Sequence, residues 1–308
     1  MRCVILGGGG FLGRHVGKVM ATAGYELWCV DMCPPHGPES TPWFKGHVQA
    51  DYWDVDHWWA ECGEPECVVH LASSTVPATA STDPVSDVNQ NLIGLLKLLE
   101  GLGRQPSAPR LLYASSGGAV YGIPQSVPID EDHPLIPIGA YGITKVACEH
   151  HIRLAETQYG LQTRILRISN PYGEWQRPNG VQGVISVFAH RALMGLPVDV
   201  WGDGSVVRDF VYAGDVAQAF VTAAHHQGSA RVFNLGGGGG HSVNHIIKTL
   251  EQLLGRHVER KTHAARSFDP PINVLDIRRA QEELSWTPRV AFEQGVAKTL
   301  EWLRVAVK

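Results

Sequence analysis

The sequence predicts an α/β protein with a doubly wound parallel sheet and a smaller, partly interleaved lobe in the C-terminal half. Short, nearly all-apolar runs alternate with helical patterns over the first two-thirds of the chain, and glycines follow the first run. After Ile168, turn-rich segments replace this alternation. We therefore expect the sheet domain at 1–169, with returning segments near 209–236, and the smaller lobe over most of 170–308.

Five apolar runs are the candidate strands, and two long helical patterns lie between them. The runs are 3–6, 27–31, 67–71, 111–114 and 164–168, and the helical patterns are 89–102 and 141–159. Strands of this composition are covered by helices on both faces. Because right-handed crossovers place the ligand beyond the carboxyl ends of such strands, we expect the site there.

Composition and charge exclude several classes of protein. The chain has 308 residues, of which 44% are hydrophobic and 18% charged, as in an ordinary globular protein. The net charge of -4 provides no basic field for nucleic acid, and no apolar run is long enough to span a membrane. The N-terminus lacks a signal-peptide pattern, so we expect a cytoplasmic protein. The spacing of the 6 cysteines matches no zinc or redox motif, so we expect no metal.

A glycine-rich turn predicts a dinucleotide site. Gly7, Gly10 and Gly13 follow the first apolar run and lead into a helical segment, and Phe11 and Leu12 between them are counted with the cofactor site. Glycine suits a tight turn, a close approach of the backbone to pyrophosphate, and helix–strand contact. The helix N-terminus adds N–H groups and the positive end of its dipole. This is the arrangement of a Rossmann sheet.

Two aspartates are candidates for binding the adenosine half of a dinucleotide. Asp31 ends the second run, 18 residues after Gly13. A carboxylate there can accept from both ribose hydroxyls and would repel the 2′-phosphate of NADP, which favours NAD. Asp51 lies where a third strand would meet the adenine. A turn residue is the alternative interpretation of Asp31, and a loop residue that of Asp51.

A Y-x-x-x-K pattern at Tyr141 and Lys145 predicts proton transfer. The spacing places the phenol and the ammonium on one helix face. The ammonium favours the ionised phenol, as would the charge of an oxidised nicotinamide. Tyr141 is therefore a candidate general base toward a hydroxyl group. An exposed Tyr/Lys pair is the alternative.

In combination, these motifs resemble those of the extended short-chain dehydrogenase/reductase family, especially its nucleotide-sugar epimerase/dehydratase branch. Segments 7–13, 69–73, 91–94 and 115–122 are similar to the family's cofactor turn, fourth strand, helix asparagine and active-site strand. The resemblance implies NAD as the cofactor and a nucleotide-diphospho-sugar as the substrate. The residues that it adds to the cofactor site are Leu71, Ala72, Ser73 and Asn91.

The chain departs from the family pattern at Gly117. The family usually has a catalytic Ser or Thr four residues before the tyrosine of its V-Y-G motif, which is Tyr121 here. We expect Ser116 to supply the missing hydroxyl and Ser115 to contact the substrate, with Ser115 or a water as alternative sources. The serines could instead only satisfy the local backbone. The Gly-Ala pair that follows cannot transfer protons as the family's dehydratases require, so dehydration is excluded.

The C-terminal half carries residues that the resemblance assigns to the substrate. Asn170 resembles an asparagine that meets the diphosphate, and Trp201 is a candidate ring for stacking on the base, with a core aromatic as the alternative. Arg208 and Arg266 resemble two arginines that clamp the diphosphate, for which surface salt bridges are the alternative. Residues that gate the sugar's C2 and C5 substituents are expected in loops 74–81 and 174–182.

The resemblance implies epimerisation at C4 of a UDP-glucose/UDP-galactose type of substrate. Tyr141 would take the 4-hydroxyl proton while NAD takes the hydride, and the 4-keto sugar would turn before the hydride returns. A 4-dehydrogenase, a 4-keto-reductase and a UDP-glucuronate decarboxylase are alternatives on the same scaffold. A cofactor-binding protein without turnover is the alternative from another class. A homodimer is expected by analogy, through helices 89–102 and 141–159.

Overall fold

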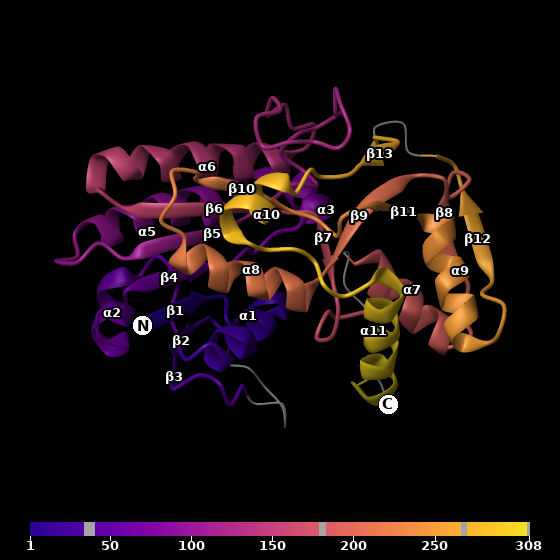
Figure 1. The fold of residues 1–308 in the computed structure, drawn as a ribbon, viewed down its shortest axis with the longest axis horizontal. Coiled ribbons are helices and arrows are strands. Elements are labelled where there is room, and N and C mark those ends of the chain that lie inside the picture. The colour runs from indigo at the N-terminus through magenta and orange to yellow at the C-terminus, as the bar shows by residue number, and fades with distance from the viewer. Residues whose placement is uncertain (34–40, 179–182, 266–269, 307–308) are drawn as a thin grey trace.

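A seven-stranded parallel sheet forms the larger part of the computed structural model, which describes residues 1–33, 41–178, 183–265 and 270–306 (Figure 1). The strand order is β10-β6-β5-β4-β1-β2-β3, and every neighbouring pair is parallel. The strands are β1 (Arg2–Leu6), β2 (Glu26–Val30), β3 (Gly46–Val48), β4 (Cys67–His70), β5 (Arg110–Ser116), β6 (Gln162–Ile168) and β10 (Val232–Leu235). The predicted doubly wound sheet is confirmed, and β3 and β10 complete it.

Helices cover both faces of this sheet because alternate side chains of each strand point to opposite sides. Cys3 and Ile5 of β1 belong to one core cluster, which α1 (Phe11–Thr22) and α8 (Ala213–His225) cover. Val4 and Leu6 belong to the other. The helices that cover this second face are α2 (Val55–Cys62), α5 (Gly94–Gly103) and α6 (Ala140–Tyr159).

The segment before α5 differs from the single helix expected at 89–102. Two short helices, α3 (Pro77–Thr82) and α4 (Pro84–Asp87), lead into a π-helical turn, η1 (Val88–Ile93), and α5 continues from it. A π turn widens the helix by one residue and changes the direction of the side chains on it. This affects the position of Asn91, which lies in η1.

A second, smaller lobe lies beside the large sheet (Figure 1). Its four-stranded sheet has the order β11-β9-β13 with β7 also paired to β9, and β12 pairs with β8. The strands are β7 (Asn170–Tyr172), β8 (Val198–Trp201), β9 (Val207–Tyr212), β11 (Gly240–Ser242), β12 (Arg260–His263) and β13 (Ile272–Asn273). The helices of the third core cluster are α7 (Val184–Leu193), α9 (Val243–Leu254) and α11 (Phe292–Ala306).

The chain passes between the two parts more than once. After β9 it returns to the large sheet as α8 and β10, and the glycine run 236–240 then leads into β11 of the smaller sheet. Near the C-terminus, α10 (Arg278–Leu284) packs on β10 before α11 joins the smaller lobe. The interleaving predicted for the C-terminal lobe is therefore present.

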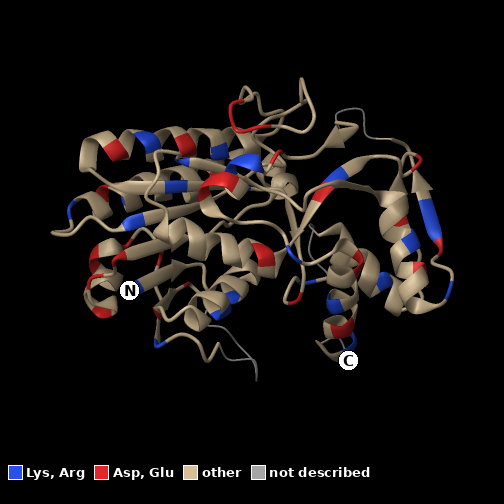
Figure 2. Cartoon of the chain, in the orientation of Figure 1, with Lys and Arg blue, Asp and Glu red and all other residues tan. Residues whose placement is uncertain are grey.

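Charged residues of both signs are interspersed over the large domain and the smaller lobe (Figure 2). Within the described ranges, the model contains no helix with the length and apolarity needed to cross a bilayer. All 6 cysteines are free thiols, and only Cys33 is exposed. Among the residues whose positions are described, no His, Cys, Asp and Glu side chains cluster in a way that could hold a metal ion.

Candidate functional site

Two adjoining cavities lie at the carboxyl ends of the parallel strands. Their volumes are about 440 Å³ and about 380 Å³. Both are lined by Gly7, Gly10, Leu71 and Ser73, so together they form one groove across the ends of β1 and β4. This is where a ligand of a doubly wound sheet is expected to bind.

The glycine turn between β1 and α1 has no space for a side chain at Gly7 or Gly13. Gly7 has a φ of +84°, and a Cβ there would lie 2.8 Å from the backbone nitrogen of Ala72. A Cβ on Gly13 would lie 2.3 Å from the carbonyl oxygen of Gly7. The turn therefore packs against the backbone on both sides, and it leads into the N-terminus of α1 without a side-chain cap. A pyrophosphate fits such a helix N-terminus.

The smaller cavity has the features expected of an adenosine pocket. Asp31 follows β2, and its carboxylate accepts hydrogen bonds from the backbone N–H groups of Gly9 at 3.0 Å and Cys33 at 3.1 Å. These bonds fix the carboxylate at the rim beside the glycine turn. Asp51 and Ala72 line the same cavity. Both aspartates therefore lie at this cavity, and their contacts with an adenosine stay predictions.

Asn91 lies behind the groove and lines neither cavity. Its Nδ2 donates to Thr75 Oγ1 and to Asp87 Oδ1, both at 2.8 Å, and its Oδ1 accepts from the backbone N–H of Ser74 at 3.3 Å. Asn91 lies in the π turn and its amide makes these bonds, so the direct cofactor contact expected for Asn91 stays a prediction. Asn91 fixes the 74–75 loop.

Tyr141, Lys145 and Ser116 meet at the larger cavity. Tyr141 and Lys145 lie one turn apart on α6, and Ser116 ends β5. The Lys145 Nζ lies 5.7 Å from the centroid of the Tyr141 ring. Lys145 is only 6% exposed, so its ammonium is largely shielded from water while Tyr141 remains accessible. The predicted catalytic residues are thus brought together.

The structure explains why Gly117 lacks a hydroxyl. A Cβ at Gly117 would point toward Leu275 and lie 2.5 Å from its Cδ1, within a small core cluster. A serine or threonine there would require the end of the Leu275 side chain to shift. A Cβ built on the next residue, Gly118, would lie 3.9 Å from both Ser116 Oγ and Asn170 Oδ1. Ser116 therefore presents its hydroxyl on the cavity side.

Ser115 borders the cavity, but its hydroxyl donates to Glu149 Oε1 at 2.5 Å. Glu149 in turn accepts from Arg167 at 2.7 Å in an ion pair whose two side chains are 4% and 5% exposed. A serine hydroxyl has a single proton to donate. Ser115 therefore does not donate to a ligand while this bond exists, and its expected contact with the substrate stays a prediction.

Of the residues predicted to bind the substrate, the structure places Asn170 in the cavity wall. Its Nδ2 donates to the Asp209 carbonyl at 2.7 Å. The Asp209 carboxylate accepts from the backbone N–H groups of Gly237 at 2.6 Å and Leu275 at 3.1 Å. Because burial raises the pKa of Asp209 to about 6, these backbone donors only partly offset its desolvation.

Trp201 and Arg208 do not line the two cavities. Trp201 is 42% exposed and stacks on His263, with ring centroids 5.1 Å apart, so it is not a core aromatic. Arg208 donates through Nη1 to the carbonyl oxygens of Val207 and Pro270. Arg266 lies outside the described residues.

Several cavity residues were not singled out individually in the sequence. Gln176 lines the larger cavity, and its amide is fixed by bonds to the Pro171 carbonyl at 3.2 Å and to Ser186 Oγ at 2.6 Å. Three of these residues, Thr75, Val76 and Gln176, lie in loops, where no periodicity marks a buried face, and the others lie in helices or strands. The other lining residues of this kind are Thr75, Val76, Pro77, Val184, Ile185 and Phe210. Those from 75 to 77 and Gln176 belong to the two loops expected to gate the sugar.

A buried histidine joins α1 to the loop that carries Gln176. The His15 Nε2 bonds to the carbonyl of Glu174 at 3.0 Å, and the Glu174 carboxylate accepts from the Tyr212 hydroxyl at 2.7 Å. The His15 ring packs edge-on to Trp175, with centroids 4.6 Å apart. Burial lowers the pKa of His15 to about 4, so this ring is neutral near pH 7.

We predict that His15 reduces stability in mild acid. The pKa of His15 is 6.5 in the unfolded chain and about 4 in the folded chain. The folded state therefore has its full stability above pH 6.5 and loses stability as the pH falls from 6.5 toward 4. Between about pH 7 and about pH 5 this amounts to about 2 kcal/mol of unfolding free energy. Urea unfolding of the parent and of His15→Gln at both pH values should show a smaller acid loss in the variant.

The comparison between the two proteins isolates His15 from other titrating groups. The raised pKa of Asp209 has the opposite effect, because its contribution to stability grows as the pH falls. It is present in both proteins and cancels in the difference. An equal loss of unfolding free energy in the parent and the variant would contradict the prediction.

Comparison with known proteins identifies relatives along the whole chain. The model of the NAD dependent epimerase/dehydratase family matches residues 3–236. A UDP-glucose 4-epimerase of Mycolicibacterium smegmatis is 33% identical over 99% of both chains. A dTDP-4-dehydro-6-deoxyglucose reductase of Escherichia coli is 30% identical over 98% of this chain and 97% of its own. The crystal structure of a Thermotoga maritima UDP-glucose 4-epimerase with UDP-glucose superposes with a TM-score of 0.93, at 33% identity and 100% coverage of both chains.

Proposed function

Because the chain belongs to the NAD-dependent epimerase/dehydratase family, we propose that it inverts C4 of a nucleotide-diphospho-sugar, with UDP-glucose and UDP-galactose as the leading pair. One observation carries the proposal: Tyr141, Lys145 and Ser116 meet in a cavity continuous with the glycine turn. A hydroxyl group of a bound sugar can therefore lie beside both a proton acceptor and the cofactor site.

The groove fits NAD along its length. The backbone of the glycine turn and the N-terminus of α1, which begins with Phe11 and Leu12, would hold the pyrophosphate. Asp31 would accept from the adenosine ribose, and Asp51 would meet the adenine. The other proposed cofactor contacts are Leu71, Ala72, Ser73, Tyr141 and Lys145. When bound, NAD accepts a hydride from the sugar and later returns it.

Tyr141 acts first as a base and then as an acid in the proposed reaction. Its phenolate accepts the proton of the sugar 4-hydroxyl, and the same proton returns to the oxygen after the sugar has turned. Lys145 stabilises the phenolate by its charge, and Ser116 donates a hydrogen bond to the reacting oxygen. The cavity wall at Gly118 and Ala119 carries no acidic group, which fits an epimerase better than a dehydratase.

The protein has to hold the substrate by its diphosphate while the keto sugar turns. We assign this task to Asn170, Arg208 and Arg266, and stacking on the base to Trp201. A flexible link that stays anchored lets either face of C4 approach the nicotinamide. We also expect a homodimer, in which the exposed Ile143 and Leu154 of α6 are covered by a second copy.

The proposal predicts conversion without added cofactor. The purified protein, incubated with UDP-galactose alone, should form UDP-glucose, because a cofactor that is regenerated in each cycle can stay bound. The nucleotide sugars are separated and quantified by chromatography, and the Tyr141→Phe variant is the control. The proposal would be overturned if no UDP-hexose, UDP-N-acetylhexosamine or UDP-hexuronate changed configuration at C4.

Stoichiometric consumption of added NAD or NADH would instead favour a 4-dehydrogenase or a 4-keto-reductase. The reductase relative makes this the nearest alternative. Release of carbon dioxide from UDP-glucuronate would identify a decarboxylase. The same assay with several nucleotide sugars therefore distinguishes the three reactions.

A further inference from the structure

The ammonium of Lys145 is held by two neutral acceptors. Nζ donates to the Tyr113 hydroxyl at 3.2 Å and to the Ala114 carbonyl at 3.0 Å. It also lies 4.7 Å from the centroid of the Tyr113 ring and 5.7 Å from that of Tyr141. The charge thus lies between the two tyrosines, one in the core and one at the cavity. A buried ammonium needs such acceptors because it has given up its hydration.

The carboxylate nearest along α6 is paired with another cation. Glu149 lies one turn beyond Lys145, a spacing at which Lys and Glu commonly pair. Both of its oxygens accept hydrogen bonds from Arg167, at 2.7 to 3.1 Å, so its charge is balanced there. Glu149 is therefore not the group that holds Lys145, and the field of the ammonium remains available to Tyr141.

Three of the other titratable groups around Lys145, namely His70, Tyr113 and Cys148, are neutral near pH 7. Burial, together with the charge of Lys145, lowers the pKa of His70 on β4 to about 3. Burial raises the pKa of Tyr113 on β5 and the pKa of Cys148 on α6, so both keep their protons near neutral pH. The Asp87 carboxylate of α4 accepts from Thr144 at 2.5 Å and from Asn91.

We propose that Tyr113 is a positioning residue that holds the Lys145 ammonium beside Tyr141 without neutralising it. Lysine has a long, flexible stem, so a fixed acceptor in the core determines where the charge lies. Tyr113 can do this because it is 2% exposed and packs against His70, with ring centroids 5.3 Å apart. The contribution of Tyr113 to turnover rests on the proposed function, whereas its effect on the ionisation of Tyr141 does not.

Tyr113→Phe tests this inference because it removes the hydroxyl and keeps the ring. With NAD bound, tyrosinate absorbance is followed during a pH titration, and the part due to Tyr141 is found by subtracting the curve of Tyr141→Phe. In Tyr113→Phe the tyrosinate absorbance due to Tyr141 should appear at higher pH than in the parent. On UDP-galactose, kcat should fall about tenfold with little change in KM, as expected for losing one hydrogen bond to a charged group.

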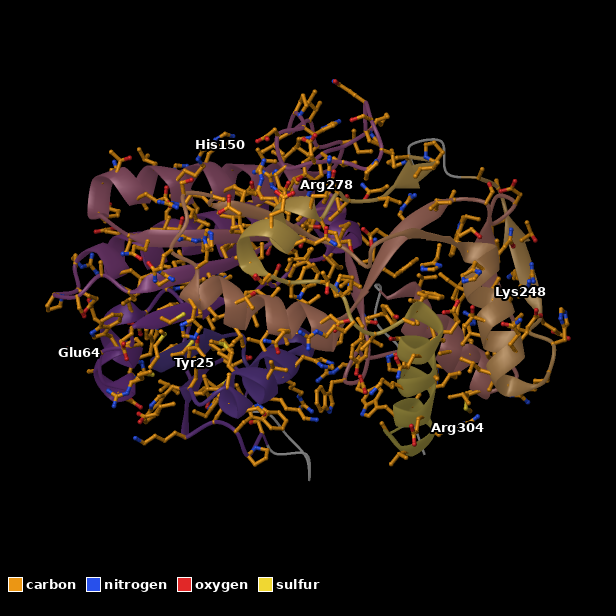
Figure 3. The ribbon with its side chains drawn as sticks, in the orientation of Figure 1. Tyr25, Glu64, His150, Lys248, Arg278 and Arg304 are labelled. Atoms are coloured by element: carbon orange, nitrogen blue, oxygen red, sulfur yellow. The ribbon has the colours of Figure 1, made fainter. Side chains whose placement is uncertain are left out.

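Tyr25→Phe is the matched control. Tyr25, labelled in Figure 3, is 7% exposed and bonds through its hydroxyl to His225 at 2.8 Å. It belongs to the core on the opposite face of the sheet from Tyr113. Its replacement should lower thermal stability to a similar extent but leave the titration, kcat and KM unchanged.

A double variant separates positioning from a merely structural role. In a Lys145→Met background, adding Tyr113→Phe should not change the tyrosinate titration further, because the charge that Tyr113 holds is gone. A titration of Tyr113→Phe identical to the parent, or an equal shift in the Lys145→Met background, would overturn the inference. If the parent inverts no sugar, the proposed function fails while the titration still tests Tyr113.

Discussion

Replacing Tyr141 with phenylalanine should lower kcat for sugar interconversion about a thousandfold. The phenol is the proposed proton acceptor, and general acid–base groups contribute about 10² to 10⁴ in rate. Tyr141 lies at the cavity surface, so the variant should fold and retain its cofactor. Steady-state kinetics with UDP-galactose, together with the cofactor content of the purified protein, measure both effects.

Tyr159→Phe is the control for this variant. Tyr159 is the last residue of the same helix, 38% exposed, and its ring covers Gly103. Its hydroxyl lies outside the two cavities, so kcat should remain that of the parent. If Tyr141→Phe retained most of the parental kcat, Tyr141 could not be the proton acceptor.

Gly13→Ala should abolish stable binding of NAD. A Cβ at this position would lie 2.3 Å from the Gly7 carbonyl oxygen and 2.6 Å from the Gly8 Cα, both of them backbone atoms. Only a movement of the turn or of α1 can relieve these contacts, and that removes the pyrophosphate site. We expect the affinity for NAD to fall at least about 100-fold, measured by isothermal titration calorimetry.

Gly239→Ala serves as the control for an added methyl group. A Cβ at Gly239 would meet nothing within 4 Å, and its φ is negative or extended. Binding of NAD and thermal stability should therefore match the parent. An unchanged affinity in Gly13→Ala would show that the turn does not hold the pyrophosphate.

The features that the sequence predicted best are those that depend on local geometry. The helical repeat was enough to predict that Tyr141 and Lys145 lie on one helix face. The position of the glycines after a strand was enough to predict the glycine turn. β10 was not among the predicted strands because it is short, ends the sheet, and follows a long excursion through the smaller lobe. Strand pairing between segments so far apart leaves no mark in local composition.

Some contacts of individual site residues could not be predicted from the sequence. Asn91 lies in a π turn, which has no clear sequence signal, and its amide bonds to Thr75, Asp87 and the backbone of Ser74. The hydrogen bond from Ser115 had no local signal because its acceptor, Glu149, lies 34 residues away. Gly117 looked like a lost hydroxyl, and the sequence could not show that a Cβ there would point toward Leu275.

The return of the chain through α8 and β10 has a consequence for modularity. A fragment that ended at residue 169 would contain the glycine turn, yet β6 would become an open edge with unpaired backbone groups. Helix α1 would also lose α8, against which it packs in the first core cluster. The cofactor-binding half is therefore not a separable unit. A gene fusion or domain exchange that cut the chain at residue 169 would remove β10, the edge strand of the sheet.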